Sequence, residues 1–486
     1  MNARTIFWLF IAVVTLARLW LILIGDISEH NAYFYACAAN PAPAYFDGPP
    51  GTALVVAAAS KVDAFWWQAL GPVWALLATA GCVSLGRRLA GASAAYAAAA
   101  VVNLLPAFNA SAMVCGPDLP ALALTLAAAA MAWDASRCQH GWSVRGWAGA
   151  AFCAALASLF AYWAAFAAIG VVGACLVRPA QRKPANGFGG AIILAACAAA
   201  LAWPMVWNAR QEWIPVAGWT PRALSQFRAS DLLDGIVLAG MALSPLTALI
   251  LIYGGLRAAR GAVASAVDSF ALVAGLPGIV ISLFAIYRGW EQGGPLLWAA
   301  AVLLPMAAAA LLPRVAWLWW TGAASAIAFS IGPVSHQISR SAEIAAAARH
   351  VIELDQRLSD DLPGGLFFIA SDPDLASVLA YHLKDVLIPP PGHPRVYTRE
   401  SQDISNQYAI WSSYDDFIET AEAPDEAFAE QKAVNPFLGR SAVYIGPEPP
   451  DQLPQAIGSA FAEVQPVQEA GGLYIYLCLN YQTLPL

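Results

Sequence analysis

The stretch Tyr45-Phe46-Asp47-Gly48-Pro49-Pro50 places a carboxylate beside a rigid Pro-Pro turn, just beyond the first apolar segment of the chain. Further apolar segments follow it, so the stretch belongs to a polar loop between two hydrophobic spans. Acidic, turn-rich loops in this position commonly mark a functional site at the water interface. We therefore expect the loop to carry function, with Asp47 as a candidate residue.

The composition indicates a polytopic membrane protein. Hydrophobic residues make up 59% of the 486 residues and charged residues only 12%, with a mean hydropathy of +0.58; soluble proteins carry roughly 25% charged residues. From about Arg340 onward the sequence becomes acidic, Pro-rich and ordinary in hydropathy. We expect a membrane domain over residues 1–337 and a soluble domain over 338–486.

The apolar segments predict eleven membrane helices, since a crossing needs about 20 mostly apolar residues. Short polar segments separate them, and the fifth and sixth are shorter than the rest. The expected spans are 5–24, 64–84, 89–108, 117–135, 146–160, 162–177, 187–206, 233–255, 265–286, 295–312 and 315–333.

Basic residues predict the orientation, because Lys and Arg accumulate in short cytoplasmic loops. With the N-terminus inside, most of the arginines and lysines at the ends of the spans fall on the cytoplasmic side. These are Arg4, Arg87, Arg88, Arg137, Arg145, Arg178, Arg182, Lys183, Arg257, Arg260 and Arg314. The loops 25–63, 109–116 and 207–232, and the C-terminal domain, then face the outer side.

Four stretches resemble, in order and spacing, the motifs of one family of membrane enzymes. The first outer loop reads Ala32-Tyr33-Phe34-Tyr35 and then the Tyr45–Pro50 stretch. It resembles D-E-A-Y-Y-W followed by Y-F-D-H-P-P. The other three stretches resemble T-P-D, W-N-x-x-x-x-W and S-Q-Y-x-x-W; they are Gly116-Pro117-Asp118, residues 207–213 and residues 405–411. The family is that of bacterial glycosyltransferases related to protein O-mannosyltransferases and the lipid A aminoarabinose transferase, which is glycosyltransferase family 39-like.

The resemblance implies a polytopic α-helical membrane protein of the GT-C type with a C-terminal soluble α/β domain. It also implies transfer of a sugar from a polyprenyl-phosphate donor to a lipid, glycan or protein acceptor. The reaction would occur on the periplasmic face of a bacterial cytoplasmic membrane. Such an enzyme mainly positions the acceptor hydroxyl, removes its proton and neutralises the departing phosphate. No nucleic-acid partner is expected, and no metal-type spacing of Cys or His occurs, although a divalent cation stays an open alternative.

Two departures from the family pattern bear on activity. An ungapped alignment of the first loop puts His30 and Asn31 where the family has its Asp-Glu pair, with Glu29 one position earlier. A one-residue shift would return a carboxylate to the site, and an imidazole can itself act as a base near neutral pH. The second departure lies at residues 158–162, where the family has S-K-Y-T and this chain has no Lys. Arg18, late in the first span, matches a family Arg and is the nearest candidate for phosphate contact.

The candidate catalytic residues are Asp47, Glu29, His30 and Asp118, which we expect to meet at the outer end of the membrane cavity. Each has a structural alternative. Asp47 can brace the Pro-Pro turn, Asp118 can stabilise a helix N-terminus, and Arg18 can snorkel to the headgroups. The candidate substrate-binding residues are Arg18, Tyr33, Tyr45, Asn208, Gln211 and Trp213. The last three can instead shape the membrane boundary, where Trp is enriched.

The C-terminal domain has the pattern of a small α/β fold with a partly parallel sheet. Helices are expected at 344–358 and 375–383, and strands at 366–370, 442–445 and 473–477. Asp372-Pro373-Asp374 has the pattern of a helix N-cap. We expect this domain to cover the outer cavity.

Two functions stay open on the sequence alone. The chain is an active lipid-linked sugar transferase with a rearranged base, or a non-catalytic relative that binds the carrier lipid or supports another transferase. A transporter is a weaker third reading, since no inverted repeat is present.

The charge asymmetry predicts that the N-terminus is cytoplasmic and the C-terminal domain periplasmic. A reporter that is active only outside the cytoplasm, fused after Leu486, should therefore be active. The matching control is a reporter fused after Arg88, in an expected cytoplasmic loop, which should be inactive. Cytoplasmic activity of the Leu486 fusion would contradict this topology.

Overall fold

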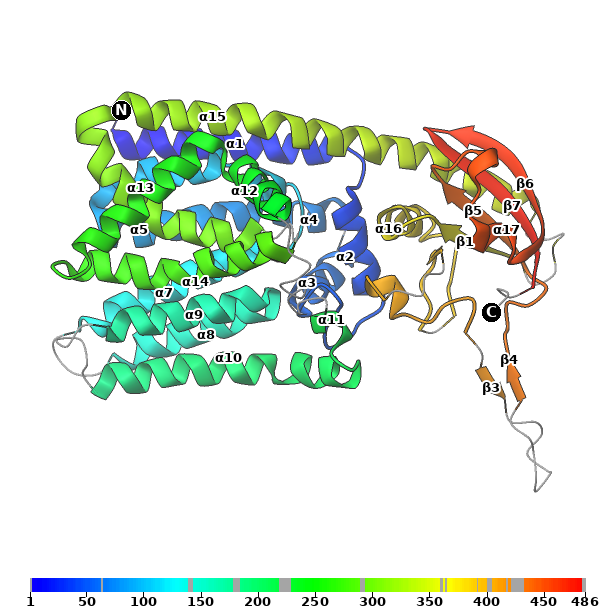
Figure 1. Ribbon diagram of the computed structural model, residues 1–486, viewed down its shortest axis with the longest axis horizontal. Coiled ribbons are helices and arrows are strands. Elements are labelled where there is room, and N and C mark those ends of the chain that lie inside the picture. Colours follow the sequence, from blue (N-terminus) through cyan, green and yellow to red (C-terminus); the bar gives the residue numbers. More distant parts are fainter. Residues whose placement is uncertain are drawn as a thin grey trace, which may run out of the picture. The chain divides into compact units, whose positions relative to one another are not determined.

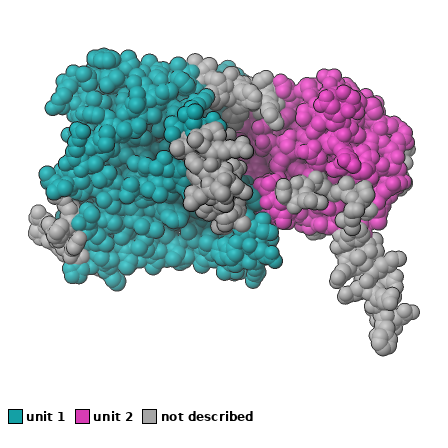
Figure 2. Space-filling view, viewed as in Figure 1, with its two compact units in different colours: residues 1–24, 42–336 teal, residues 25–41, 337–486 magenta. Residues whose placement is uncertain are grey.

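The computed structural model describes residues 2–62, 64–138, 143–177, 184–217, 229–288, 293–358, 362, 365–390, 392–399, 404–416, 418–420 and 432–482. These residues form two compact units, shown in separate colours in Figure 2. Unit 1 comprises residues 1–24 and 42–336, and unit 2 comprises residues 25–41 and 337–486. Arg178, Arg182 and Lys183, and part of the expected loop 207–232, lie outside the described residues.

Unit 1 is a bundle of α-helices, most of them apolar (Figure 1). Its helices are α1 (Ala3–Ile24), α3 (Gly51–Ala59), α4 (Ala64–Gln68), α5 (Leu70–Leu104), α6 (Pro106–Ala112), α7 (Asp118–Ser136), α8 (Val144–Phe160), α9 (Tyr162–Leu176), α10 (Pro184–Arg210), α11 (Ile214–Ala217), α12 (Ala229–Leu243), α13 (Pro245–Gly261), α14 (Ala266–Arg288) and the first part of α15 (Gly293–Leu358). Among the described residues, six helices are long and apolar enough to cross a membrane, or up to seven if a bent pair is one span. Together with the fold comparison given below, this confirms a polytopic helical membrane protein.

Breaks within helices account for the larger number of expected spans. α5 contains non-helical backbone at Gly91 (φ 81°, ψ 171°), and Gly86 packs against Ala95 across this break. α15 is broken at Val315 (φ −142°, ψ 56°). Each of these helices therefore contains two of the expected spans. The fifth and sixth expected spans are α8 and α9, which are apolar but under 18 residues long.

The expected span over 233–255 is broken by a bend in the structure. The structure instead bends the chain by 95° between Leu233–Leu243 and Pro245–Gly261. Ser244 occupies the bend with φ at 62°, and its Oγ contacts Thr247 Oγ1 at 2.9 Å. Pro245 cannot continue a helix from the preceding turn, because it lacks the N–H and clashes with that turn. Pro245 therefore begins a new helix at its first position.

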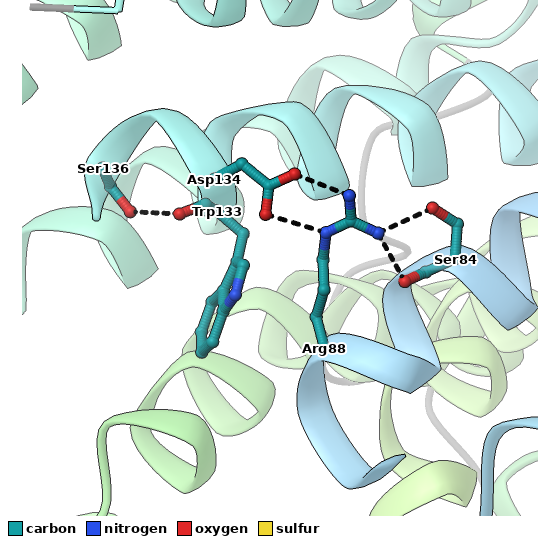
Figure 3. Close-up of polar contacts among 5 residues, drawn as sticks. All are labelled: Ser84, Arg88, Trp133, Asp134 and Ser136. Atoms are coloured by element: carbon teal, nitrogen blue, oxygen red, sulfur yellow. Dashed lines mark hydrogen bonds and ion pairs between the residues drawn. The ribbon is translucent and has the colours of Figure 1, made fainter. Parts of the chain in front are cut away.

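A paired arginine ties α5 to α7 at the end of the bundle that carries the predicted cytoplasmic loops (Figure 3). Arg88 donates to both carboxylate oxygens of Asp134, at 2.9 Å from Nε and 2.6 Å from Nη2. Its Nη1 donates to the carbonyl and hydroxyl oxygens of Ser84. Nearby, the Arg137 guanidinium lies 3.6 Å from the centre of the Trp133 ring. The two-point geometry fixes the relative rotation of the two helices.

Unit 2 is an α/β domain with a five-stranded sheet in the order β2-β1-β5-β7-β6. β1 pairs in parallel with β2 and β5, and the other pairings of this sheet are antiparallel. The expected partly parallel sheet is therefore confirmed. The elements are α2 (Glu29–Ala39), the second part of α15, β1 (Leu366–Ala370), α16 (Pro373–His382), β2 (Tyr397–Thr398), β3 (Ile418–Thr420), β4 (Lys432–Val434), β5 (Ser441–Gly446), α17 (Gln455–Gly458), β6 (Phe461–Ala470) and β7 (Leu473–Tyr481), with 3-10 turns at Gln407–Ala409 and Pro450–Gln452.

The first outer loop is helical and divided between the units, unlike the expected loop 25–63 of the membrane domain. α2 belongs to unit 2 because it packs against α16, where the rings of Tyr35 and Tyr381 meet edge-on at 5.1 Å. α3 follows the Tyr45–Pro50 stretch in unit 1. The division at His336/Gln337 falls one residue from the expected boundary at 337/338.

Two motifs of unit 2 have structural roles. Asp372 accepts a hydrogen bond from Leu375 N at 2.9 Å, which confirms the expected N-cap of α16. In the stretch 405–411, Asn406 Oδ1 accepts from Ala409 N and Tyr408 is buried with its hydroxyl 3.0 Å from Ser377 Oγ. The resemblance at residues 405–411 therefore corresponds to a turn that packs on α16.

Candidate functional site

The Tyr45–Pro50 stretch forms a tight turn that presents Asp47 to solvent. Tyr45 N donates to Gly48 O at 2.9 Å, and Gly48 N donates back to Tyr45 O at 3.1 Å. The Tyr45 ring is buried, and its hydroxyl accepts from Ala42 N. Asp47 is exposed at the tip of this turn. α3 then begins without a side-chain cap, so in this structure Asp47 is not the N-cap of α3.

α3 lies against the junction of α8 and α9. The backbone of Gly51 packs so closely on α8 that a Cβ there would lie 2.5 Å from Leu159 O. Glycine is required here because another side chain would collide with backbone. Leu159 holds the position where the family has its Lys, and its carbonyl is part of this contact. The turn that carries Asp47 is therefore next to the α8–α9 junction.

The α8–α9 junction is in turn bonded to the end of α10. Ala161 is extended (φ −150°, ψ 134°) and separates the two helices. Tyr162 begins α9, and its hydroxyl accepts from Asn208 Nδ2 at 3.1 Å. Asn208 Nδ2 also donates to Pro204 O, while Asn208 Oδ1 is buried without a hydrogen-bond partner among the described residues. Asn208 thus joins α9 to α10, and its buried position shows a packing role in unit 1.

The stretch 207–213 ends α10 in a Schellman-type cap. Trp213 N donates to Asn208 O at 2.8 Å and Glu212 N donates to Ala209 O at 3.2 Å, which is the 6→1 and 5→2 pattern. Glu212 and Trp213 both have positive φ, at 53° and 61°. Gln211 is half-buried, and Trp213 is 45% exposed. Two consecutive non-glycine residues in this region carry backbone strain, a feature that clusters at functional sites.

Asp118 lies at the same end of unit 1, at the start of α7. Its Oδ1 accepts from Trp163 Nε1 at 3.3 Å, and the carboxylate is half-buried. The first residues of α15 pass closely over this pair: a Cβ on Gly294 would collide with both Asp118 Oδ1 and Trp163 Nε1. A glycine is therefore needed at position 294 for the carboxylate to keep this place.

The structure thus brings Asp47 and Asp118 to one end of unit 1. The connection runs from the Asp47 turn through Gly51 to α8, across Ala161 to Trp163, and from there to Asp118. Asn208, Gln211 and Trp213 lie at this end as well, through the bond of Asn208 to Tyr162.

Glu29, His30 and Tyr33 lie in unit 2, in the first turns of α2. Ser28 caps this helix by accepting from Asn31 N at 3.3 Å. Glu29 is half-buried, His30 is exposed, and the Tyr33 ring contacts Phe34. Their approach to Asp47 and Asp118 stays a prediction.

Arg18 is buried in an internal hydrogen-bond network. Its Nη2 donates to Asn103 O at 2.9 Å and to Asn109 Oδ1 at 2.6 Å, and its Nη1 donates to Asn103 Oδ1 at 3.3 Å. Asn109 donates onward to Ser330 Oγ. The side chain is only 4% exposed, so the snorkelling alternative is wrong. The guanidinium instead bonds a carbonyl at the C-terminal end of α5, where helix carbonyls lack partners and a cation is favoured.

The sequence analysis did not identify two kinds of residue that bond to the candidate site residues. Trp163 directly follows the S-L-F-A-Y stretch, so its position beside a family motif was an available signal. Asn103 and Asn109 are amides within apolar segments, where polar side chains are expensive and therefore bonded. No group of three or more His, Cys, Asp or Glu that suits a metal ion occurs in the described part of the chain, and we derive no step through a metal.

The architecture defines a GT-C-type polytopic membrane protein with a C-terminal α/β domain, as the motif resemblance predicted. The solved structures with this fold include ArnT, the lipid A aminoarabinose transferase, from Cupriavidus metallidurans. Its apo crystal structure is 13% identical, covers 98% of each chain and has a TM-score of 0.63. The crystal structure of the same protein bound to undecaprenyl phosphate is 12% identical, with 98% of each chain covered and a TM-score of 0.62. The likeness is one of fold.

Other comparisons add little. The oligosaccharyltransferase from Archaeoglobus fulgidus is 13% identical over 76% of this chain and 60% of its own, with a TM-score of 0.46, and carries no argument. Neither the protein-family models nor the curated proteins that were searched gave a match.

Arg18→Gln should destabilise the protein, because it leaves Asn103 O and Asn109 Oδ1 buried without this donor. We expect a loss of about 2–6 kcal/mol in the free energy of unfolding, at about 1–3 kcal/mol for each of the two unsatisfied groups. Thermal unfolding in detergent measures it, with the exposed Arg4→Gln as a matched control that should change little. An unchanged melting temperature together with weakened lipid-phosphate binding would instead assign Arg18 to the phosphate.

Gly294→Ala should displace the Asp118–Trp163 pair, because the added methyl group has no space. Overpacking of this kind costs about 1–3 kcal/mol. The control is Gly187→Ala in α10, where nothing lies within 4 Å of the new methyl group and the helix should gain about 0.5–1 kcal/mol. Equal melting temperatures for Gly294→Ala and the wild type would contradict the close packing over Asp118.

Proposed function

We propose that the protein is a glycosyltransferase of the bacterial inner membrane that takes a sugar from a polyprenyl-phosphate carrier. In this proposal the sugar passes to a lipid, glycan or protein acceptor on the periplasmic face. The observation that carries it is the fold, which matches ArnT over 98% of both chains, including a structure of ArnT with undecaprenyl phosphate bound. The position of Asp47 supports it further, because this carboxylate lies at the exposed tip of a turn held by backbone bonds.

The chemistry required of the protein is limited. The acceptor hydroxyl loses its proton as its oxygen attacks the anomeric carbon, and the bond from that carbon to the phosphate oxygen breaks. A carboxylate within hydrogen-bond reach of the hydroxyl acts as the base. Asp47 is exposed and held by the Tyr45–Gly48 backbone bonds, which suits this role. Asp118 already accepts from Trp163, so we assign it to positioning within the site.

The departing phosphate requires a cation, and the two positions named by the resemblance do not offer one readily. Leu159 stands where the family has Lys, and Arg18 bonds internally. Arg210 is an alternative at this end, since it is exposed in the last turn of α10. Its guanidinium fork matches phosphate oxygens bidentately.

The same observations favour a second candidate, a non-catalytic relative that binds the carrier lipid or supports another transferase. This chain has the fold, but it uses Arg18 for packing and lacks the Lys and the Asp-Glu pair of the motifs that it resembles. These features are expected of a protein that does not catalyse transfer. The two candidates differ in one measurable property, turnover of a polyprenyl-phosphate sugar.

For the active enzyme, Asp47→Asn should lower the transfer rate more than about a hundredfold, the usual contribution of a positioned base. Glu29→Gln and His30→Gln should cause smaller, pH-dependent losses if these residues share that role. The measurement is transfer of radiolabelled sugar from a polyprenyl-phosphate donor by purified protein. Asp451→Asn, which removes an exposed carboxylate of unit 2, is the matched control and should leave the rate unchanged.

Two outcomes would contradict parts of the proposal. Equal rates for wild type and Asp47→Asn would remove Asp47 from the mechanism. Absence of transfer by the wild type, with carrier-lipid binding retained, would favour the non-catalytic relative.

A further inference from the structure

An ordered loop in unit 2 presents apolar side chains to solvent. It comprises residues 384–390, directly after α16, and is named the apolar loop here. Ile388 is 95% exposed and Val386 is 41% exposed. Isolated exposed apolar residues are common, but an almost fully exposed isoleucine beside an exposed valine on one short loop forms a local apolar tip.

Hydrogen bonds hold the apolar loop in this conformation. Val386 N and Leu387 N both donate to Leu383 O, at 3.1 and 2.9 Å, and Arg395 Nε donates to Leu387 O at 3.2 Å. Pro389 and Pro390 restrict the backbone that follows Ile388. The exposure of Ile388 is therefore a property of a bonded turn and is not that of a loose chain end.

The loop has the composition of a segment that enters a membrane interface. Lys384 lies at its base, with Nζ 4.0 Å from the centre of the Tyr381 ring, and Arg395 bonds its backbone. Basic residues are attracted to anionic lipids, and tyrosines are enriched at the headgroup level. Asp385 is the acidic residue of the loop and Asp26 the acidic residue near its base, so the charge there is mixed while the tip is apolar.

Chain connectivity limits the distance between the end of α1 and the start of α2. α1 is a 22-residue apolar helix that is mostly unburied. It is long enough to cross a bilayer and to end at the bilayer surface near Ile24. Only residues 25–28 separate Ile24 from α2, a span of at most about 14 Å. α2 packs on α16 through Tyr35 and Tyr381, and Lys384 follows three residues after Tyr381.

An electrostatic interaction within unit 2 also links the segment after α1 to the base of the apolar loop. Burial lowers the pKa of His382, and the Asp26 carboxylate partly offsets this, while Lys384 and Arg349 add to the lowering. Asp26 is therefore within electrostatic reach of the residue two positions before Lys384. It is also two residues beyond the end of α1.

We propose that the apolar loop inserts Val386 and Ile388 into the lipid leaflet at which α1 ends. The partner is a lipid surface, with Lys384 and Arg395 at the headgroup level. The insertion would give unit 2 a third attachment to the membrane, in addition to its covalent links to α1 and α15. This inference does not depend on the proposed transferase activity.

The test uses an environment-sensitive fluorophore, NBD, attached to Ile388→Cys in the full chain. Cys138 is exposed and is first replaced by Ala, and this background without a new cysteine measures residual labelling. The matched control is Val467→Cys, on the exposed strand β6 of the same unit and 41% exposed in the wild type. The proteins are reconstituted in vesicles of phosphatidylethanolamine and phosphatidylglycerol, with or without a spin-labelled lipid.

We expect blue-shifted emission from NBD at position 388 and quenching by the spin-labelled lipid at least about twofold stronger than at position 467. Aqueous iodide should quench position 467 more than position 388. Equal quenching of both positions by iodide, without lipid quenching, would overturn the proposal. A blue shift at position 388 without lipid quenching would overturn it as well, because the covering surface would then be protein, including a second copy of this chain. Equal melting temperatures of the labelled variants and the background establish that the substitutions leave the fold intact.

Discussion

Satisfying backbone polar groups at helix breaks is the constraint on which unit 1 depends, because the bilayer core offers no water as a partner. At the end of α5 the carbonyl of Asn103 accepts from Arg18, and Ser330 Oγ donates to the carbonyl of Leu104. At the 95° bend, Ser244 and Thr247 bond each other, and Thr247 donates to Gly322 O. The breaks are therefore sites where side chains from other helices are held, and through them α1, α5, α13 and α15 keep a single arrangement.

The two ends of unit 1 are held together by different kinds of contact. At one end Arg88 and Asp134 form a two-point ion pair between helices. At the other end the helices stop in tight turns and in the strained cap of α10. Glycines allow the close approaches there: Gly51 packs against the backbone of Leu159, and Gly294 packs against the side chains of Asp118 and Trp163. One end is therefore held by paired long side chains, and the other by close packing at glycines.

The sequence predicted the helices and strands of the fold better than the way in which they bend, pair and pack together. Apolar length located the spans, and local rules located β1, α16 and the Asp372 cap, since each depends on neighbours a few residues away. The bend at Ser244 was missed although Pro245 signalled it, because an apolar run does not show where it breaks. β6 was missed because it is an exposed edge strand that gains most of its stability from pairing with β7. The place of α2 in unit 2 depends on Tyr381, which is more than 340 residues away in sequence.

The candidate site residues divide into those that pack within their own unit and those that are exposed. Asn208, Tyr408 and Arg18 were found by resemblance, yet each bonds to other parts of its own unit, so in this structure they make packing contacts of the fold. Asp47 differs from them in exposure, because it lies at the exposed tip of a turn that is held by backbone bonds. A fold can keep its packing residues while its reactive groups change, since the two sets share few contacts. At Leu159 the backbone carbonyl, which any residue supplies, is what packs against Gly51, so this contact does not depend on the side chain at that position.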